Sequence, residues 1–133
     1  MSMPSRGSGP VALSLPFATF WEWLHAHANC ILRAGTPDVL LFDHDDFHWH
    51  LASEDESTLL LQVMRAKDIV GEIVVFANEV AYVQAEPAEP ANSEEYIFEC
   101  VVETDESREV LYQFVMAHGY DGSDEPAADR WTH

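Results

Sequence analysis

The stretch FHWHLASEDESTLLLQVMRAKDIVGEIVVF, residues 47–76, decides the fold of this chain. Its first residues, 47–51, alternate aromatic or apolar side chains with histidines, which is typical of a half-buried strand. A polar turn at residues 53–57 separates this strand from the apolar run 58–65, and Lys67-Asp68 is a suitable next turn. Connections this short favour antiparallel pairing, because a parallel crossover needs about a dozen or more residues. The stretch therefore predicts an antiparallel meander.

Further strands are expected on both sides of this meander. Residues 39–42 form an apolar run before it. Residues 72–86 are rich in Val, Ile, Phe and Tyr, and form either one long bulged strand or two strands joined at Asn78-Glu79. After the loop 87–93, residues 94–104 alternate again and predict a strand. One face of this last strand carries Tyr96, Phe98, Cys100 and Val102. The sequence thus predicts a sheet of about 4–6 strands.

One amphipathic helix is expected before the strands and one after them. The first has Ser14 as a candidate N-cap, carries apolar residues at helical spacing as far as Leu32, and ends at Gly35. The second would start near Asp105 and be capped by Gly119. Two such helices can cover one face of the sheet, so the predicted fold is α+β, a two-layer sandwich.

A chain of 133 residues suits a single domain. Residues 1–13 contain Gly, Ser and Pro without periodicity and are predicted to be a flexible arm. Residues 14–119 would form one α+β domain, and residues 120–133 a disordered acidic tail. No stretch has the roughly 20 apolar residues of a membrane span, so a cytoplasmic location is expected.

The charge of the chain restricts its partners. Twenty-four Asp and Glu residues face six Lys and Arg, a formal net charge of −18. Such a chain lacks the cations that neutralise phosphates, which excludes direct nucleic-acid binding and equally disfavours anionic membranes. Residues 36–109 contain nineteen of the acidic residues, so the sheet region carries most of the excess. A basic protein is the expected partner.

The predicted strand 94–104 offers a binding face opposite its apolar face. Acidic and apolar side chains would alternate along it, and such a mixture suits a protein interface, although a merely solvated outer face has the same pattern. The candidate binding residues are Glu95, Ile97, Glu99, Val101 and Glu103.

A second candidate site is the segment DHDDFHWH, residues 43–50. His48 and His50 would project from the same side of a strand, as in H-x-H pairs that bind first-row metals, and Asp45 in the adjoining turn could add a carboxylate. The alternative is an exposed strand face beside an acidic turn. A calcium loop starting at Asp43 is excluded, because Phe47 stands at a ligand position and His48 where glycine is required.

Enzymatic motifs are absent from the sequence. It contains no glycine-rich phosphate loop, no H-E-x-x-H, no G-x-S-x-G and no paired C-x-x-C, and no cofactor is implied. Cys30, in the predicted first helix, and Cys100, in an apolar strand row, are expected to be reduced and buried.

The sequence therefore favours a non-enzymatic acidic protein-binding module, in its sharpest form an inhibitor or immunity-type protein that neutralises a basic partner. The first alternative is a structural or adaptor subunit that self-assembles into a homo-oligomer or joins a larger complex. The second alternative is a metal-binding protein that uses His48 and His50.

Overall fold

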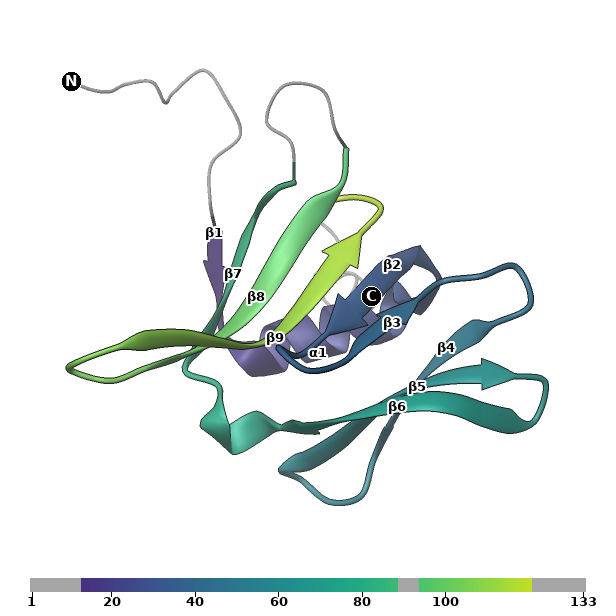
Figure 1. Ribbon diagram of the computed structural model, residues 1–133. Helices are drawn as coiled ribbons and strands as arrows, with labels where there is room; N and C mark the ends of the chain where they lie inside the picture. The colour runs from purple at the N-terminus through teal and green to yellow at the C-terminus, as the bar shows by residue number, and fades with distance from the viewer. Residues whose placement is uncertain (1–12, 89–93, 121–133) are drawn as a thin grey trace, which may run out of the picture.

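The computed structural model describes residues 13–88 and 94–120, and within them the chain is almost entirely antiparallel β-structure (Figure 1). One α-helix and nine strands are present in these residues. The strands are β1 (Leu13–Leu15), β2 (Ile31–Gly35), β3 (Leu40–Phe42), β4 (His48–Ser53), β5 (Thr58–Arg65), β6 (Asp68–Phe76), β7 (Tyr82–Pro87), β8 (Tyr96–Glu103) and β9 (Arg108–Met116). The helix is α1 (Phe17–Ala26), and two short 3-10 turns are η2 (Ala28–Cys30) and η3 (Ala77–Glu79).

The strands form two separate sheets. The six-stranded sheet has the order β1-β7-β8-β9-β2-β3, and the three-stranded sheet has the order β4-β5-β6. Both are antiparallel throughout. The chain leaves the large sheet after β3, builds the small sheet, and returns to the large sheet through η3 and β7.

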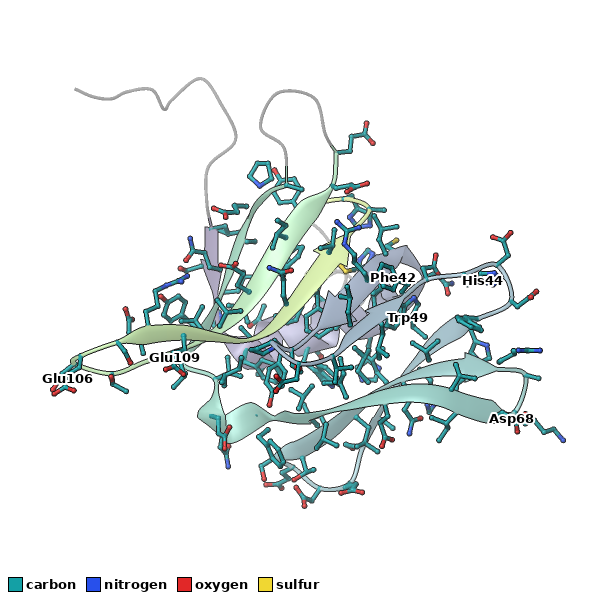
Figure 2. All side chains as sticks on the ribbon, in the orientation of Figure 1. Phe42, His44, Trp49, Asp68, Glu106 and Glu109 are labelled. Carbon is teal, nitrogen blue, oxygen red and sulfur yellow. The ribbon has the colours of Figure 1, made fainter. Side chains whose placement is uncertain are left out.

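The small sheet is the meander that residues 47–76 predict. Trp49 (labelled in Figure 2) pairs with Val63 and Leu51 with Leu61, so the buried residues of β4 and β5 share one face. The Asp55 side chain closes the intervening turn by accepting hydrogen bonds from the backbone N–H groups of Ser57 and Thr58, both at 2.9 Å. The strands predicted for residues 47–51 and 58–65 and the turn between them are confirmed. The next turn is formed by Ala66 and Lys67, so that β6 begins at Asp68, before the start at residue 72 that the composition predicts.

The first helix is shorter than predicted. Ser14 lies in β1, and Pro16 precedes the helix as its N-cap residue. The helix ends at Ala26, and Ile31 starts a strand that pairs with β9 at Met116. Tertiary pairing of β-branched Ile31 thus overrides the helical spacing that extended the prediction to Leu32.

The predicted second helix is wrong, because residues 108–116 form β9. Asp105 and Glu106 are the central residues of a tight hairpin, closed by a bond from the backbone N–H of Thr104 to the carbonyl of Ser107 at 2.8 Å. Strand β9 buries both of its faces near its end, where Phe114, Val115 and Met116 are all at most 3% exposed. Residues buried on both faces of a strand can imitate a helical stripe, which explains the wrong prediction.

The α+β two-layer sandwich is therefore also wrong. One core connects the helix with both sheets: Phe20 of α1 stacks on Phe98 with ring centroids 5.2 Å apart and meets Phe114 edge-on. Leu61 and Val75 of the small sheet belong to the same buried cluster. Figure 1 shows α1 behind the large sheet, with the small sheet below both.

The open question about residues 72–86 is answered by η3. These residues form two strands joined at Ala77–Glu79, but the two strands belong to different sheets and do not form a hairpin. By contrast, the strand predicted for residues 94–104 is confirmed as β8, with Phe98 and Cys100 fully buried in the core.

Candidate functional site

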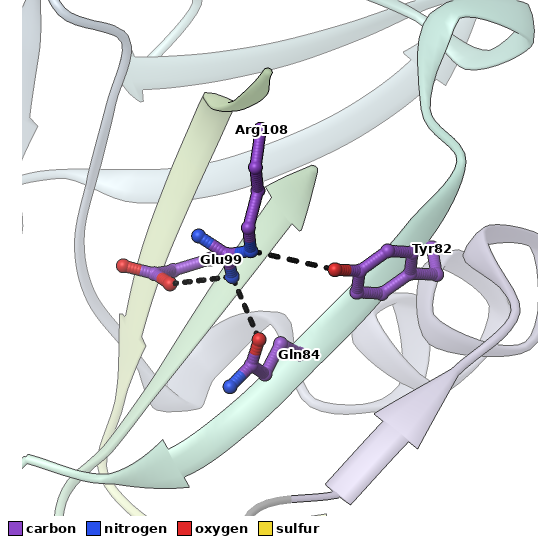
Figure 3. Close-up of polar contacts among 4 residues, drawn as sticks. All are labelled: Tyr82, Gln84, Glu99 and Arg108. Atoms are coloured by element: carbon purple, nitrogen blue, oxygen red, sulfur yellow. Dashed lines mark hydrogen bonds and ion pairs between the residues drawn. The ribbon is translucent and has the colours of Figure 1, made fainter. Parts of the chain in front are cut away.

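The outer face of the large sheet carries the predicted β8 residues, but their charge is partly neutralised. The guanidinium group of Arg108 donates a hydrogen bond to Gln84 Oε1 at 2.7 Å and lies 3.6 Å from the carboxylate of Glu99 (Figure 3). It also donates to the Tyr82 hydroxyl at 3.4 Å, and this hydroxyl, together with Glu99, raises the pKa of Arg108. Arg108, one of the few cationic residues in the chain, thus partly neutralises Glu99, the central carboxylate of the predicted acidic face.

The other predicted binding residues differ widely in exposure. Val101 is fully buried, and it pairs with Tyr82 of β7 on one side and with Val110 of β9 on the other. Ile97 is half-buried opposite Val115. Glu95 is half-buried and Glu103 is exposed. The strand therefore offers a less open acidic and apolar face than the alternation predicts.

A more exposed mixture of acidic and apolar side chains lies around edge strand β3. Leu40 is 54% exposed and Phe42 58%, the highest values among the exposed large hydrophobic residues. Leu41 points the other way, against Gly71 of the small sheet. A shallow pocket beside Leu40 is lined by the β2–β3 turn and by residues 110–113 of β9. We use the name β3 surface for Val39, Leu40 and Phe42 with the exposed carboxylates at their two ends, Asp38, Asp43, Asp45 and Asp46.

His48 and His50 share the outer face of the small sheet, as expected, while Trp49 and Leu51 between them are buried. Within the described residues, however, their ring nitrogens and the carboxylate of Asp45 do not form a group of three potential ligands. The Nδ1 atom of His50 instead lies 3.0 Å from Gln62 Oε1. Metal binding by this pair therefore stays a prediction, without a third ligand in the described part of the chain.

His50 belongs to a polar row across the small sheet. Gln62, only 8% exposed, donates from Nε2 to the carboxylate of Glu72 at 2.7 Å. Its Oε1 atom can only accept, so Nδ1 of His50 carries the proton of that bond. The row satisfies the buried amide, which accounts for a polar residue at a buried position.

One cluster of metal-ligating side chains does form, and the sequence prediction missed it. The ligand atoms of His27, Cys30 and His118 all lie within 4.8 Å of one another, and all three residues are half-buried. His118 Nε2 and Cys30 Sγ lie 3.2 Å apart. The imidazole rings of His27 and His118 have centroids 5.1 Å apart.

The backbone around the cluster holds its parts together. His27 is the C-cap residue of α1, and its carbonyl accepts a hydrogen bond from the Cys30 N–H at 2.8 Å. The Cys30 carbonyl in turn accepts from Ala117 N–H at 2.8 Å, next to His118. The following residue, Gly119, packs so closely on the ring of Tyr96 that a Cβ atom there would lie 2.7 Å from it.

The local signal for this cluster is the spacing His27-x-x-Cys30, in the segment HANC. Helical periodicity places this segment in the predicted first helix, with Cys30 packed and buried. Cys30 instead lies in η2 after the helix ends, and is half-buried. His118 lies 88 residues further along the chain, so only the fold brings the third ligand to the pair.

Both cysteines are free, as expected, but they differ in environment. Cys100 is fully buried, and this burial raises the pKa of its thiol.

Comparison of the chain with protein-family models, with curated proteins and with solved structures found no match. In the described residues, no helix is long and apolar enough to cross a membrane.

Proposed function

We propose that the protein is a cytoplasmic, non-enzymatic binding module that presents the β3 surface to a basic protein partner. The observation that supports this best is the exposure of Leu40 and Phe42, at 54% and 58%, between carboxylates at both ends of the strand. Large apolar side chains that are exposed to water often mark a surface that a binding partner buries. Neutralisation of a basic toxin or nuclease is the sharpest form of this proposal.

The charges of the β3 surface complement a basic partner. Asp43 follows Phe42 directly in the chain, Asp45 and Asp46 follow His44, and all three carboxylates are exposed. Carboxylates around an apolar centre steer a basic protein toward it and speed association at low ionic strength. The β8 carboxylates contribute less in this proposal, because Arg108 already pairs with Glu99.

A comparison of matched variants tests this function. The full-length protein is immobilised beside the variant Leu40→Ser/Phe42→Ser and the charge variant Asp43→Asn/Asp45→Asn/Asp46→Asn. All are exposed to lysate from the source organism at graded salt, and bound proteins are quantified by mass spectrometry. Val74→Ser/Phe76→Ser, on the exposed face of the small sheet, serves as the control.

We expect a basic protein that the wild type and the control retain and that both β3 variants lose. Its association rate, measured with the purified partner, should fall by about tenfold or more between low and physiological salt. Equal capture by the wild type and both β3 variants, or a rate that is independent of salt, would contradict the proposal.

A second candidate function, a self-assembling adaptor subunit, is favoured by a different surface. The small sheet exposes Val74 and Phe76 at 38% and 45%, and its edge strand β6 also exposes Ile69 and Val70 near its start. Light scattering separates the two functions. A stable homo-oligomer that Val74→Ser/Phe76→Ser disperses into monomers would support the adaptor.

A further inference from the structure

We propose that His27, Cys30 and His118 form a binding site for one transition-metal ion, and that Zn²⁺ is the ion that this site fits best. The proposal does not depend on the β3 surface, because the metal cluster lies at the junction of α1, η2 and the end of β9. It differs from the His48 and His50 pair in containing three potential ligands, one of them the sulfur of a cysteine.

The positions of the three ligand atoms suit a tetrahedral ion. Bonds of about 2.0 Å to imidazole nitrogen and about 2.3 Å to sulfur place tetrahedral ligand atoms roughly 3.4–3.6 Å from one another. His118 Nε2 and Cys30 Sγ are already 3.2 Å apart, and His27 is within 4.8 Å of both. The three atoms are therefore already near the separations that one tetrahedral ion requires, and we expect side-chain rotation to complete the site.

The hydrogen bond of His118 leaves its second nitrogen ready for a metal. Nδ1 lies 3.0 Å from the carbonyl oxygen of Gly119, which can only accept. Nδ1 thus carries the proton, and in the neutral ring Nε2 has the lone pair that faces Cys30 Sγ. Histidine ligands of metals commonly donate their other N–H to a backbone carbonyl in this way, which fixes the tautomer and the ring orientation.

Aromatic side chains enclose the cluster on one side. Trp23 is only 5% exposed, and its ring meets the His118 ring edge-on at 5.8 Å and lies 4.7 Å from that of His27. Tyr120 packs on the same indole, with centroids 5.5 Å apart. Such a shell limits the access of water to the ligands and lowers the local dielectric constant, which strengthens metal coordination. It also places a fluorescent indole beside the ion.

The combination of ligands selects the class of metal. One thiolate and two neutral imidazoles are poor ligands for Ca²⁺ and Mg²⁺, which prefer oxygen, and good ligands for Zn²⁺. A reactive cysteine paired with one histidine would use Cys30 and His118 alone, so the second imidazole of His27 favours metal binding over nucleophilic chemistry. Three protein ligands leave the fourth position of a tetrahedral zinc site for solvent or another group.

Metal titration of the full-length, reduced protein tests the site. Zn²⁺ binding is measured by competition with a chromophoric chelator, and Co²⁺ is used as a spectroscopic substitute. The ligand variants are Cys30→Ser, His27→Gln and His118→Gln. The matched controls are His25→Gln, an exposed histidine near the end of the same helix, and His48→Gln/His50→Gln.

We expect one Zn²⁺ per chain, with affinity at least about tenfold weaker in each ligand variant and unchanged in both controls. Co²⁺ should give the absorption of a tetrahedral complex with a sulfur-to-cobalt charge-transfer band, and Cys30→Ser should lack that band. Quenching of tryptophan fluorescence by Co²⁺ should disappear in the same variant. Circular dichroism of the metal-free variants checks that their folding matches the wild type.

Two results would overturn the assignment. The first is the absence of Zn²⁺ binding, or a Co²⁺ spectrum of the wild type without the charge-transfer band, which needs no variant and so does not depend on how the variants fold. The second is binding that survives Cys30→Ser but is lost in His48→Gln/His50→Gln, which would move the metal to the small sheet.

Discussion

Cys30 and Cys100 differ in the surroundings of their sulfur atoms. Burial raises the pKa of the Cys100 thiol, whereas Cys30 is half-buried beside His118. Because the thiolate is the reactive form, native protein should be alkylated by iodoacetamide at Cys30 and not at Cys100. Peptide mass spectrometry measures the two sites, and both should react after unfolding in urea. Labelling of both cysteines at equal rates in the native state would show that the core around Cys100 opens readily.

Asp55 gives the clearest dependence on pH. Backbone N–H bonds from Ser57 and Thr58 hold the pKa of this carboxyl below its usual 3.8. Its folded pKa is thus lower than its unfolded pKa, so its contribution is present above about pH 4 and is lost as the pH falls through the folded value. We expect Asp55→Ala to lower the thermal midpoint at pH 7, and this difference to shrink below pH 4.

Asp55→Asn is the control for this turn. Its amide oxygen can accept the same two backbone bonds without a charge, so the midpoint at pH 7 should fall between those of the wild type and Asp55→Ala. A difference between wild type and Asp55→Ala that stays constant from pH 7 to pH 3 would exclude the charge as its cause.

At the scale of elements, Tyr112 joins the two sheets. Its hydroxyl, on β9, accepts a hydrogen bond from the Phe76 N–H of β6 at 2.9 Å. Tyr112→Phe should lower the free energy of unfolding by about 1–2 kcal/mol, because it leaves this partly buried N–H unpaired. Tyr82→Phe is the matched control, since among the described residues its hydroxyl has only the long 3.4 Å bond to exposed Arg108. Urea unfolding measures both; equal effects would show that the link between the sheets contributes little.

The helix depends on a different contact. Phe20 is fully buried between Phe98 and Phe114 of the large sheet. Phe20→Ala should therefore cost about 3–5 kcal/mol, through lost burial and the cavity that remains. Phe17→Ala, one turn earlier and half-buried, should cost clearly less, and the same urea titration compares them. Similar costs at both positions would mean that the core refills around the missing ring.

Elements with local signals could be predicted from the sequence. The alternation of Trp49 and Leu51 with histidines, and of Phe98 and Cys100 with glutamates, identified two strands correctly. The prediction failed where both faces of a strand are buried, as at the end of β9, and where strand pairing overrides helical spacing, as at Ile31. Apolar and polar residues alternate along a strand when one of its faces is exposed, so a segment that is buried on both faces does not show this pattern.

The candidate metal site shows the same limit. The spacing of His27 and Cys30 is visible in the sequence, but His118 reaches them only because β2 pairs with the end of β9. The β3 surface was better signalled, as an apolar run that breaks at Asp43. What the sequence could not show is that Leu40 and Phe42 lie outward on an edge strand.

For the whole molecule, the formal net charge of −18 lowers the stability of the folded state. Like charges repel across a folded protein, and the distance over which they do so shrinks from about 30 Å at 0.01 M salt to about 8 Å at 0.15 M. The thermal midpoint should therefore rise with NaCl over this range. Differential scanning fluorimetry measures it, with a nonionic osmolyte at equal osmolality as the control. A midpoint that falls with salt would mean that ion pairs such as Arg108–Glu99 outweigh the repulsion.

The return of the chain to the large sheet through η3 also bears on the order in which the protein is built. The small sheet comes from one continuous segment, residues 48–76, and closes through short turns. The large sheet needs residues 31–42 to meet residues 82–116, with the whole small sheet as the intervening loop. Contacts between distant segments form later because closing the long loop costs entropy. On a ribosome, the meander can thus fold while the strands that complete the large sheet are still being synthesised, and the three candidate metal ligands come together only in the last step.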